Sequence, residues 1–182
     1  RTDFHEEYLY WNFLQYTFRR QWKALKQYCN GLGVRIIGDL PLYVATDSAD
    51  VWAHPELFKL DRELRPTKVA GVPPDYFTET GQLWGNPLYN WEYHKNTGYG
   101  WWISRLAHCY RLYDVVRIDH FRGFDEYYSI PPDADTAGGG HREKGPGLAC
   151  MQAAPAARRE QRHTPEVRGH RPATTTQRGR RR

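Results

Sequence analysis

The sequence has few cysteines, and their spacing excludes the usual cysteine-dependent sites. The 182 residues include only Cys29, Cys109 and Cys150, which are odd in number and far apart. No CxxC pair or histidine-rich cluster accompanies them, so neither a disulfide framework nor a zinc site is expected. We expect free thiols in a reducing compartment, which fits a cytoplasmic protein.

The sequence also lacks the patterns of membrane spans and of common cofactor sites. No apolar run approaches the length of about 18 residues that a membrane span needs, and no signal peptide is visible. No P-loop, GxGxxG, HExxH or EF-hand spacing is present, so phosphate, dinucleotide and metal chemistry are not supported. We therefore expect no cofactor, no metal and no membrane partner. Because the chain opens on Arg1 rather than Met, we expect an internal fragment of a longer protein.

Aromatic residues are missing from the C-terminal part of the chain, where positive charge accumulates. All 27 Phe, Trp and Tyr residues lie at or before Tyr128. Residues 1–137 carry 15 basic and 18 acidic residues, a net charge of −3, whereas residues 138–182 carry 11 and 3, a net charge of +8. With almost no large apolar residues, residues 138–182 cannot offset the entropy of ordering. We predict a folded domain over 1–137 and a disordered, arginine-rich tail over 138–182, which is either a nucleic-acid-binding segment or an out-of-frame terminus.

The first two thirds of the chain have the pattern of a parallel α/β fold. Apolar residues at helical spacing predict a helix over residues 4–29, and short strands are predicted over 34–39 and 115–119. A helix of about 20 residues followed by a strand is typical of α/β proteins. We predict that the two strands are parallel neighbours, with Asp39 and Asp119, the acids that end them, at the same end. Residues 66–90, interrupted by glycine and proline, predict a long functional loop.

The end of the second predicted strand places a guanidinium beside a carboxylate. Strand side chains alternate between faces, so Arg117 and Asp119 point the same way. Barrel enzymes keep catalytic groups at such strand ends. A neighbouring guanidinium favours the ionised carboxylate, which suits a nucleophile. From these residues alone, the alternative is a structural ion pair at a strand end.

Five stretches of the chain resemble the 4-α-glucanotransferases (amylomaltases or disproportionating enzymes), glycoside hydrolase family 77. They are GVRIIGDLPLYVA at 33–45, DSADVWA at 47–53, VAGVPPDYF at 69–77, GQLWGNPLY at 81–89 and VVRIDHFRGF at 115–124. The likeness runs from about residue 4 to about residue 137. It implies part of a TIM (β/α)₈ barrel, whose closed form needs about 250 residues. It also implies an enzyme of carbohydrate metabolism that transfers α-1,4-glucan segments without a cofactor, and no nucleic-acid partner.

The resemblance assigns roles to four residues near the two strand ends. It makes Asp119 the nucleophile of a retaining double displacement, with Arg117 holding it ionised and oriented. It gives Asp39 a supporting place in the polar network, although a residue before Leu-Pro is more often a turn or cap residue. It places His120 against sugar hydroxyls, and a structural hydrogen bond is the alternative.

The predicted loop resembles a lid over the sugar groove of this family. Its flat aromatic side chains, Tyr76, Phe77 and Trp84, are predicted to pack against glucose rings, and Asp75 and Asn86 to bond to hydroxyls. The alternative is that the aromatic side chains fill a core.

The second carboxyl group that retaining transfer requires is missing. The family carries it as the Glu of an Ala-Glu-Asp-Leu-Gly motif that precedes Thr-Pro-Glu-Val, and this chain has only the second motif, at residues 164–167. If residues 164–167 correspond to the family's Thr-Pro-Glu-Val, Arg158 stands at the position of the catalytic Glu. A guanidinium stays protonated and cannot give and take a proton in turn. We therefore expect a 4-α-glucanotransferase fragment that is inactive by itself. The rival hypothesis is a basic, partly disordered binding protein that acts through its arginine-rich tail.

Overall fold

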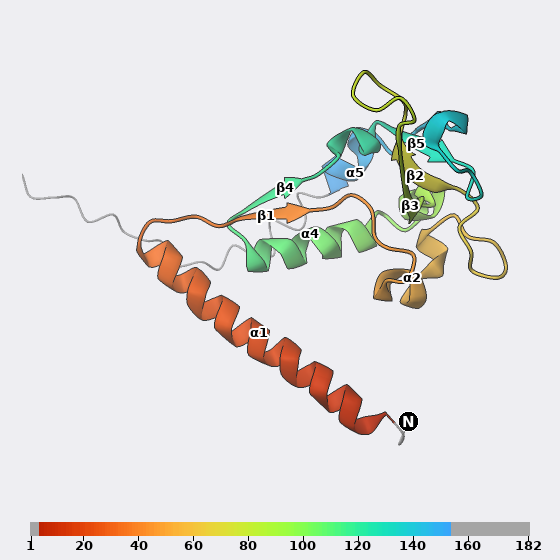
Figure 1. Ribbon diagram of the computed structural model, residues 1–182. Coiled ribbons are helices and arrows are strands. Elements are labelled where there is room, and N and C mark those ends of the chain that lie inside the picture. Colours follow the sequence, from red (N-terminus) through yellow and green to blue (C-terminus); the bar gives the residue numbers. More distant parts are fainter. Residues whose placement is uncertain (1–3, 154–182) are drawn as a thin grey trace, which may run out of the picture.

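The structure is a computed structural model, and it describes residues 4–153 of the chain. This part of the chain contains five α-helices and six β-strands, and Figure 1 shows how they are arranged. The helices are α1 (His5–Gly31), α2 (Ala49–Ala53), α3 (Trp91–Asn96), α4 (Gly100–Leu112) and α5 (Leu148–Ala153). The strands are β1 (Ile37–Leu40), β2 (Val69–Val72), β3 (Gln82–Pro87), β4 (Val115–Ile118), β5 (Glu126–Ile130) and β6 (His141–Lys144). Short 3₁₀ turns lie at Pro55–Leu57, Phe121–Phe124 and Ala137–Gly139.

β1 and β4 lie side by side as a parallel pair (Figure 1). The register sets Asp39 of β1 opposite Arg117 of β4. Beyond β4, the Asp119 amide donates to the Leu40 carbonyl at 2.9 Å. The prediction of parallel neighbours with both acids at one end is confirmed, although β1 begins at Ile37 rather than three residues earlier. α4 leads directly into β4 and packs against both strands, as in an α/β unit.

A separate antiparallel sheet of four strands, in the order β3-β2-β5-β6, shows that the predicted loop over residues 66–90 is wrong. β2 and β3 both fall inside that range and pair with each other. The residues that indicated a loop stand at strand ends or at a bulge: Pro73 follows β2, Pro87 ends β3, and the pairing is irregular beside Gly71. Proline is tolerated at strand ends and glycine at bulges, so neither excludes a strand. The true loop is confined to residues 73–81.

The prediction of a disordered tail from residue 138 onward is also wrong, because residues 138–153 are folded. β6 pairs along its length with β5. Glu143 of β6 accepts hydrogen bonds from Lys59 Nζ and Tyr127 Oη, both at 2.7 Å. Backbone pairing and an ion pair therefore order β6, which has no large apolar residue, and Cys150 and Met151 of α5 pack against the core. The rest of the predicted tail, residues 154–182, lies outside the described residues.

The core lies between α4, the segment that follows β1 and the turn that follows β4. Trp102 of α4 is buried there with Tyr89 and Phe124. Cys150 of α5 packs into the same cluster and is 1% exposed. The Tyr89 hydroxyl donates to the Leu42 carbonyl at 2.7 Å. The core thus fixes the segment after β1, which borders the candidate site.

α1 projects from the rest of the structure as a long arm (Figure 1). The helix predicted over residues 4–29 is confirmed in place, but none of its residues is buried. Trp22 Nε1 donates to the Leu112 carbonyl at 2.8 Å, and Lys26 Nζ lies 3.3 Å from Asp114 Oδ1. Both contacts lie in the C-terminal half of the helix. None of the helices within residues 4–153 combines the length and the apolar character that a membrane span requires.

Candidate functional site

One arginine binds two carboxylates at the C-terminal ends of β1 and β4. Arg117 donates through Nη1 to Asp39 Oδ2 at 2.6 Å and through Nη2 to Asp119 Oδ1 at 2.7 Å. Such short distances are typical of charge-assisted hydrogen bonds. The strand register explains the geometry, since Asp39 lies directly opposite Arg117 and Asp119 follows two residues later on the same face. The residues predicted as nucleophile and orienting group are therefore in contact, and we call this arrangement the Arg117 fork.

The fork also settles where the Asp39 side chain lies. Sequence alone favoured a turn or cap role, but in the structure the carboxylate pairs with Arg117 across the strands. The side chains of Arg117, Asp39 and Asp119 are 61%, 56% and 54% exposed, respectively. Exposed ion pairs contribute about 0–1 kcal/mol to stability, so the fork orients its members more than it stabilises the fold.

Asp119 borders an open hollow of about 540 Å³, which we call the Asp119 hollow. It is lined by Pro41, Leu42, Tyr43, Leu83, Trp84, Asn86, Asp119 and His120. Of the predicted site residues, the structure brings Trp84, Asn86, Asp119 and His120 together here. β3 supplies Trp84 and Asn86, and the turn after β4 supplies His120. The site therefore needs both the parallel pair and the antiparallel sheet.

Two predicted side chains on β3 are already fixed by hydrogen bonds within the protein. Trp84 Nε1 donates to Gln82 Oε1, and Asn86 Nδ2 donates to the Val44 carbonyl, both at 2.9 Å. The Trp84 and His120 rings meet edge to face with centroids 4.9 Å apart. This contact forms one wall of the Asp119 hollow.

His120 has an unusual backbone conformation and an electrostatically perturbed ring. Its φ of 50° lies in the left-handed region, which is uncommon for a residue with a side chain. Burial lowers the pKa of its imidazole; Asp119 opposes this change, and Arg122 and Arg142 add to it. The imidazole is therefore mainly neutral at pH 7, and a neutral imidazole can both donate and accept a hydrogen bond.

Asp75, Tyr76 and Phe77 do not line the Asp119 hollow, because they lie on the loop between β2 and β3. Asp75 Oδ1 accepts hydrogen bonds from the Thr78 amide at 2.8 Å, the Phe77 amide at 2.9 Å and the Thr78 hydroxyl at 3.1 Å. These bonds lower the pKa of the Asp75 carboxyl and shape an Asx turn. Tyr76 and Phe77 are 96% and 89% exposed. The structure therefore divides the predicted sugar-contact residues into a group at the hollow and a group at the loop tip.

His120 also lines a second hollow, of about 280 Å³, that the sequence did not predict. Its other walls include Asp75, Arg122, Glu126 and Arg142. Glu126 pairs with Arg122, at 3.7 Å, and with a lysine of β6. The imidazole of His120 thus borders both the Asp119 hollow, whose walls are largely apolar, and a hollow with several charged residues.

The sequence-based prediction missed Tyr43, which lines the Asp119 hollow. Its ring stacks on Tyr89 with centroids 6.0 Å apart and meets the Trp84 ring at 6.1 Å. Tyr43 follows Asp39 by four residues in the first of the five stretches that resemble the family, and this proximity was the available signal.

Gly123 is a second residue that the sequence-based prediction missed. A Cβ at this position would lie 2.2 Å from Leu42 Cδ2 and 3.3 Å from His120 Cδ2. Glycine therefore allows the turn after β4 to close against the segment after β1. No sequence pattern indicated this contact, because the two segments lie about 80 residues apart.

The predicted position of the acid–base group, at Arg158, and the motif at residues 164–167 lie outside the described residues. Among residues 4–153, no group of three or more His, Cys, Asp or Glu side chains is arranged to hold a metal ion.

Comparisons with known proteins agree on one family. A family model described as 4-alpha-glucanotransferase matches residues 1–166, well beyond the predicted limit at residue 137. A 4-alpha-glucanotransferase from Thermus thermophilus is 57% identical over 147 residues, which cover 81% of this chain and 29% of that protein. The corresponding protein from Clostridium butyricum is 51% identical over 147 residues, which cover 80% of this chain and 30% of that protein.

Solved structures agree with these matches. The amylomaltase from Streptococcus agalactiae, in complex with acarbose, has a TM-score of 0.76 and 46% identity, covering 86% of this chain and 32% of that one. The amylomaltase from Corynebacterium glutamicum, at 22% identity and a TM-score of 0.70, shows likeness of fold alone. The chain spans about 30% of the length of the curated relatives. The rival hypothesis of a basic binding protein gains no support, and the chain belongs to the 4-alpha-glucanotransferase family.

Proposed function

We propose that this chain supplies the nucleophile-bearing part of a retaining 4-α-glucanotransferase. The reaction transfers a segment of an α-1,4-glucan, such as a maltooligosaccharide, to the 4-hydroxyl of an acceptor glucose. The observation that carries the proposal is the Arg117 fork, which orients the Asp119 carboxylate at the edge of a hollow walled by Trp84 and His120. Membership of the family supports the substrate class.

In the first step, Asp119 attacks the anomeric carbon of the donor glucose. Arg117 binds Oδ1, so the attack is assigned to Oδ2. As this bond forms, the bond to the leaving glycosidic oxygen breaks, and a second carboxyl group gives that oxygen its proton. The products are a covalent glucosyl-enzyme and a shortened glucan.

In the second step, the acceptor 4-hydroxyl gives its proton to the second carboxylate and attacks the anomeric carbon. The bond to Asp119 breaks, and two successive inversions retain the α configuration. While Asp119 is esterified it carries no charge, and Asp39 then remains as the counter-ion of Arg117. This gives Asp39 its supporting role.

The remaining predicted residues are proposed to contact sugar. Flat aromatic faces suit the apolar faces of glucose rings, a role we assign to Trp84 at the hollow and to Tyr76 and Phe77 on the exposed loop tip, which acts as a lid. Asn86 and His120 line the hollow and are assigned to hydroxyl groups. Asp75 is also assigned to hydroxyl groups, through the second hollow. The acarbose bound by the amylomaltase from Streptococcus agalactiae supports a ligand site in this family.

The proposal includes a fold, a compartment and a limit on activity. β1 and β4 are taken as neighbouring strands of a TIM (β/α)₈ barrel of which this chain is a part. A cytoplasmic location is supported by three free cysteines. The predicted sequence motif of the second carboxyl group is missing from the 182-residue chain. Because general acid–base help is worth about 10² to 10⁴ in rate, the chain alone is expected not to disproportionate maltotriose.

The test uses a graft in which this chain replaces the matched segment of the Thermus thermophilus relative. Product chromatography should show longer and shorter glucans formed from maltotriose by the graft. Asp119→Asn should lower turnover by about 10⁴ or more, the size of loss seen when a member of a catalytic unit is removed. Asp125→Asn, an exposed acid six residues further along, is the matched control and should retain turnover. Undiminished turnover in Asp119→Asn would overturn the nucleophile assignment.

A further inference from the structure

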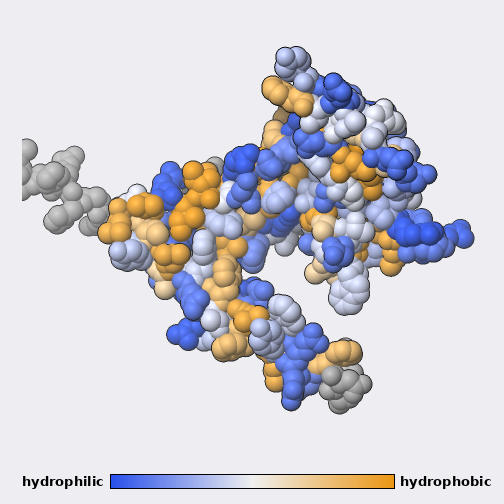
Figure 2. Space-filling model, viewed as in Figure 1, coloured by the Kyte–Doolittle hydropathy of each residue, from blue (hydrophilic) through white to orange (hydrophobic). Residues whose placement is uncertain are grey.

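A groove of about 310 Å³ lies between α1 and the C-terminal end of α4. Four of its lining residues are basic: Arg19, Lys23, Lys26 and Arg111. We call it the basic groove. The two helices are joined beside it, because Trp22 Nε1 donates to the Leu112 carbonyl at 2.8 Å. Figure 2 shows hydrophilic side chains among apolar ones along the arm that α1 forms. The basic groove therefore combines residues of two helices that contact each other.

Helical spacing brings the basic residues of α1 onto one face. Arg19, Lys23 and Lys26 follow one another at intervals of four and three residues, so their side chains share a side of the helix. At a rise of about 1.5 Å per residue, the span from Arg19 to Lys26 is about 10 Å. Arg111, in the last turn of α4, lines the other side of the groove. The positive charge is thus concentrated within a short distance.

Acidic residues near the groove neutralise only part of this charge. α4 contains no Asp or Glu, and both acids of α1 lie in its first turn. Asp114, which follows α4, lies with Oδ1 3.3 Å from Lys26 Nζ. Its Oδ2 accepts hydrogen bonds from Asn30 Nδ2 and the Ile36 amide, both at 2.8 Å. Asp114 therefore neutralises Lys26 and has its second oxygen occupied.

The other three basic residues of the groove have no acidic partner within residues 4–153. None of Arg19, Lys23 and Arg111 forms an ion pair with a carboxylate in this part of the chain. Arg111 Nη2 lies 3.2 Å from His108 Nδ1. Burial lowers the pKa of the His108 imidazole, and the charges of Arg111 and Arg19 lower it further. An anion between these crowded positive charges would stabilise them.

The helix dipole accounts for only one of the three unpaired charges. Cations stabilise the last turn of a helix, and Arg111 lies in the last turn of α4. Arg19 and Lys23, in contrast, lie well before the end of α1 at Gly31, and the last turn of α1 contains no basic residue. A negatively charged ligand accounts for both.

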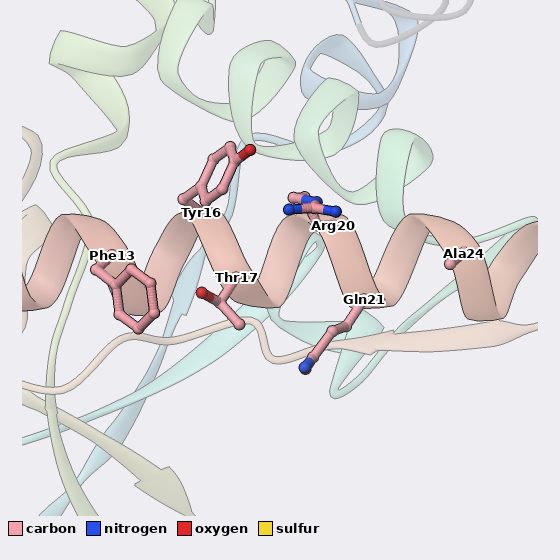
Figure 3. A pocket seen from close by; sticks show the side chains of 6 residues that line it. All are labelled: Phe13, Tyr16, Thr17, Arg20, Gln21 and Ala24. Carbon is pink, nitrogen blue, oxygen red and sulfur yellow. The ribbon is translucent and has the colours of Figure 1, made fainter.

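Arg20, the next basic residue of α1, lies outside the basic groove. Its guanidinium lies 5.7 Å from the centre of the Tyr16 ring. Figure 3 shows Arg20 and Tyr16 on one side of the helix, beside a separate hollow that α1 alone lines. The unpaired charge that one ligand can reach in the groove is therefore limited to three side chains.

We propose that the basic groove binds a phosphoryl group, carried either by inorganic phosphate or by a phosphorylated sugar. The planar guanidinium groups of Arg19 and Arg111 donate to its oxygens, and the Lys23 ammonium adds a point charge. Three cations within about 10 Å match one compact dianion, whereas a nucleic acid is held by a longer row of charges.

The basic groove and the Asp119 hollow lie at opposite ends of the parallel strand pair. Asp114 precedes β4, and Asp119 follows it. At about 3.3 Å per residue, the strand separates these two acids by about 16 Å. A phosphoryl group in the groove therefore does not compete with a glucan in the Asp119 hollow, and the inference is independent of the proposed function.

Calorimetric titration of the 182-residue chain at low ionic strength measures the binding of inorganic phosphate and, separately, of glucose 6-phosphate. The double variant Arg19→Gln/Lys23→Gln should weaken binding about tenfold or more, since it removes two of the three unpaired cations. Equal affinity for the two ligands assigns the site to free phosphate, and about tenfold tighter binding of glucose 6-phosphate assigns it to the ester.

The matched control is Arg62→Gln/Lys95→Gln, which removes the same charge at exposed positions outside the groove. This variant should bind within about twofold of the parent chain. Residues 154–182, with their nine arginines, are present in every variant, so their contribution to binding is the same throughout.

An NMR titration of His108 is a second measurement, which does not depend on the charge variants. Saturating phosphate should raise the pKa of His108, because the anion offsets the charges of Arg111 and Arg19. His108→Gln identifies the signal. Three results would each overturn the inference: equal loss of binding in the two double variants, a pKa of His108 that phosphate leaves unchanged, or tighter binding of a single-stranded oligonucleotide that only Arg19→Gln/Lys23→Gln abolishes.

Discussion

Replacing Glu143 with glutamine should lower the free energy of unfolding by about 2 kcal/mol at pH 7. Glu143 Oε2 accepts hydrogen bonds from Lys59 Nζ and Tyr127 Oη at 2.7 Å each, and Lys59 Nζ lies 2.9 Å from Tyr127 Oη. The Glu143 and Lys59 side chains are only 26% and 32% exposed. Glutamine keeps an acceptor oxygen but leaves the lysine without its counter-ion, and an unpaired, partly buried charge is costly.

The pKa of Glu143 gives the size of this stabilisation and the direction in which it changes with pH. Burial raises the pKa of the Glu143 carboxyl, but hydrogen bonds from Lys59 and Tyr127 outweigh it and lower the pKa from 4.5 to about 2. Because the folded-state pKa is depressed, the stabilisation is fully present above the unfolded pKa and is lost as pH falls toward 2. A shift of this size corresponds to about 3 kcal/mol, and solvent screening of the exposed quarter reduces it to about 2 kcal/mol.

Urea unfolding followed by tryptophan fluorescence measures this effect. The difference in unfolding free energy between parent and Glu143→Gln should be about 2 kcal/mol at pH 7 and less than about 1 kcal/mol at pH 3. Glu63→Gln is the matched control, because Glu63 is 65% exposed in its pair with Arg65. That change should alter stability by no more than about 0.5 kcal/mol. Equal penalties at both pH values for Glu143→Gln would refute the reasoning.

Three further predictions follow from burial in the site and the core. Gly123→Ala should lower the unfolding free energy by about 1–3 kcal/mol through overpacking, whereas at Gly139 an added Cβ meets nothing within 4 Å and alanine should be tolerated. Cys150, 1% exposed and with its pKa raised to about 12 by burial, should react with a thiol reagent about 100-fold more slowly than Cys29; equal rates would contradict its burial. An NMR titration, with His120→Gln to identify the signal, should place the pKa of His120 below 6.5, and a midpoint at or above that value would be inconsistent with its desolvation.

The contact between Arg117 and Asp119 could be predicted from the sequence because it depends on a local rule. The alternation of strand side chains sets Arg117 and Asp119 on one face. The place of Asp39 in the polar network was expected only from the family resemblance, because its pairing with Arg117 depends on the register of two distant strands. Trp84 and His120 were also identified, although through resemblance and not through any rule that predicts their contact. Local periodicity and a family motif were therefore sufficient for the centre of the site.

The antiparallel sheet could not be predicted, because its order depends on contacts between distant segments. β6 contains no large apolar residue, and Glu143 is held by Lys59, 84 positions away in the sequence. Composition reports the cost of ordering a segment but not the partners that offset it. For the same reason Tyr76 and Phe77, close in sequence to Trp84, lie away from the Asp119 hollow.

The exposure of the Arg117 fork weakens the electrostatic interactions that orient Asp119. Two unit charges 4 Å apart interact by about 1 kcal/mol in water and by about 4 kcal/mol at an effective dielectric constant of 20. With Arg117 and Asp119 61% and 54% exposed, the described residues hold the nucleophile in place but leave it in the weaker of these environments. Excluding water from the site strengthens each such interaction, and a glucan bound in the Asp119 hollow would exclude it. Maltotriose bound to the Asp119→Asn graft should therefore slow hydrogen exchange of the backbone around residue 119. Unchanged exchange at saturating maltotriose would show that the sugar does not shield the fork from water.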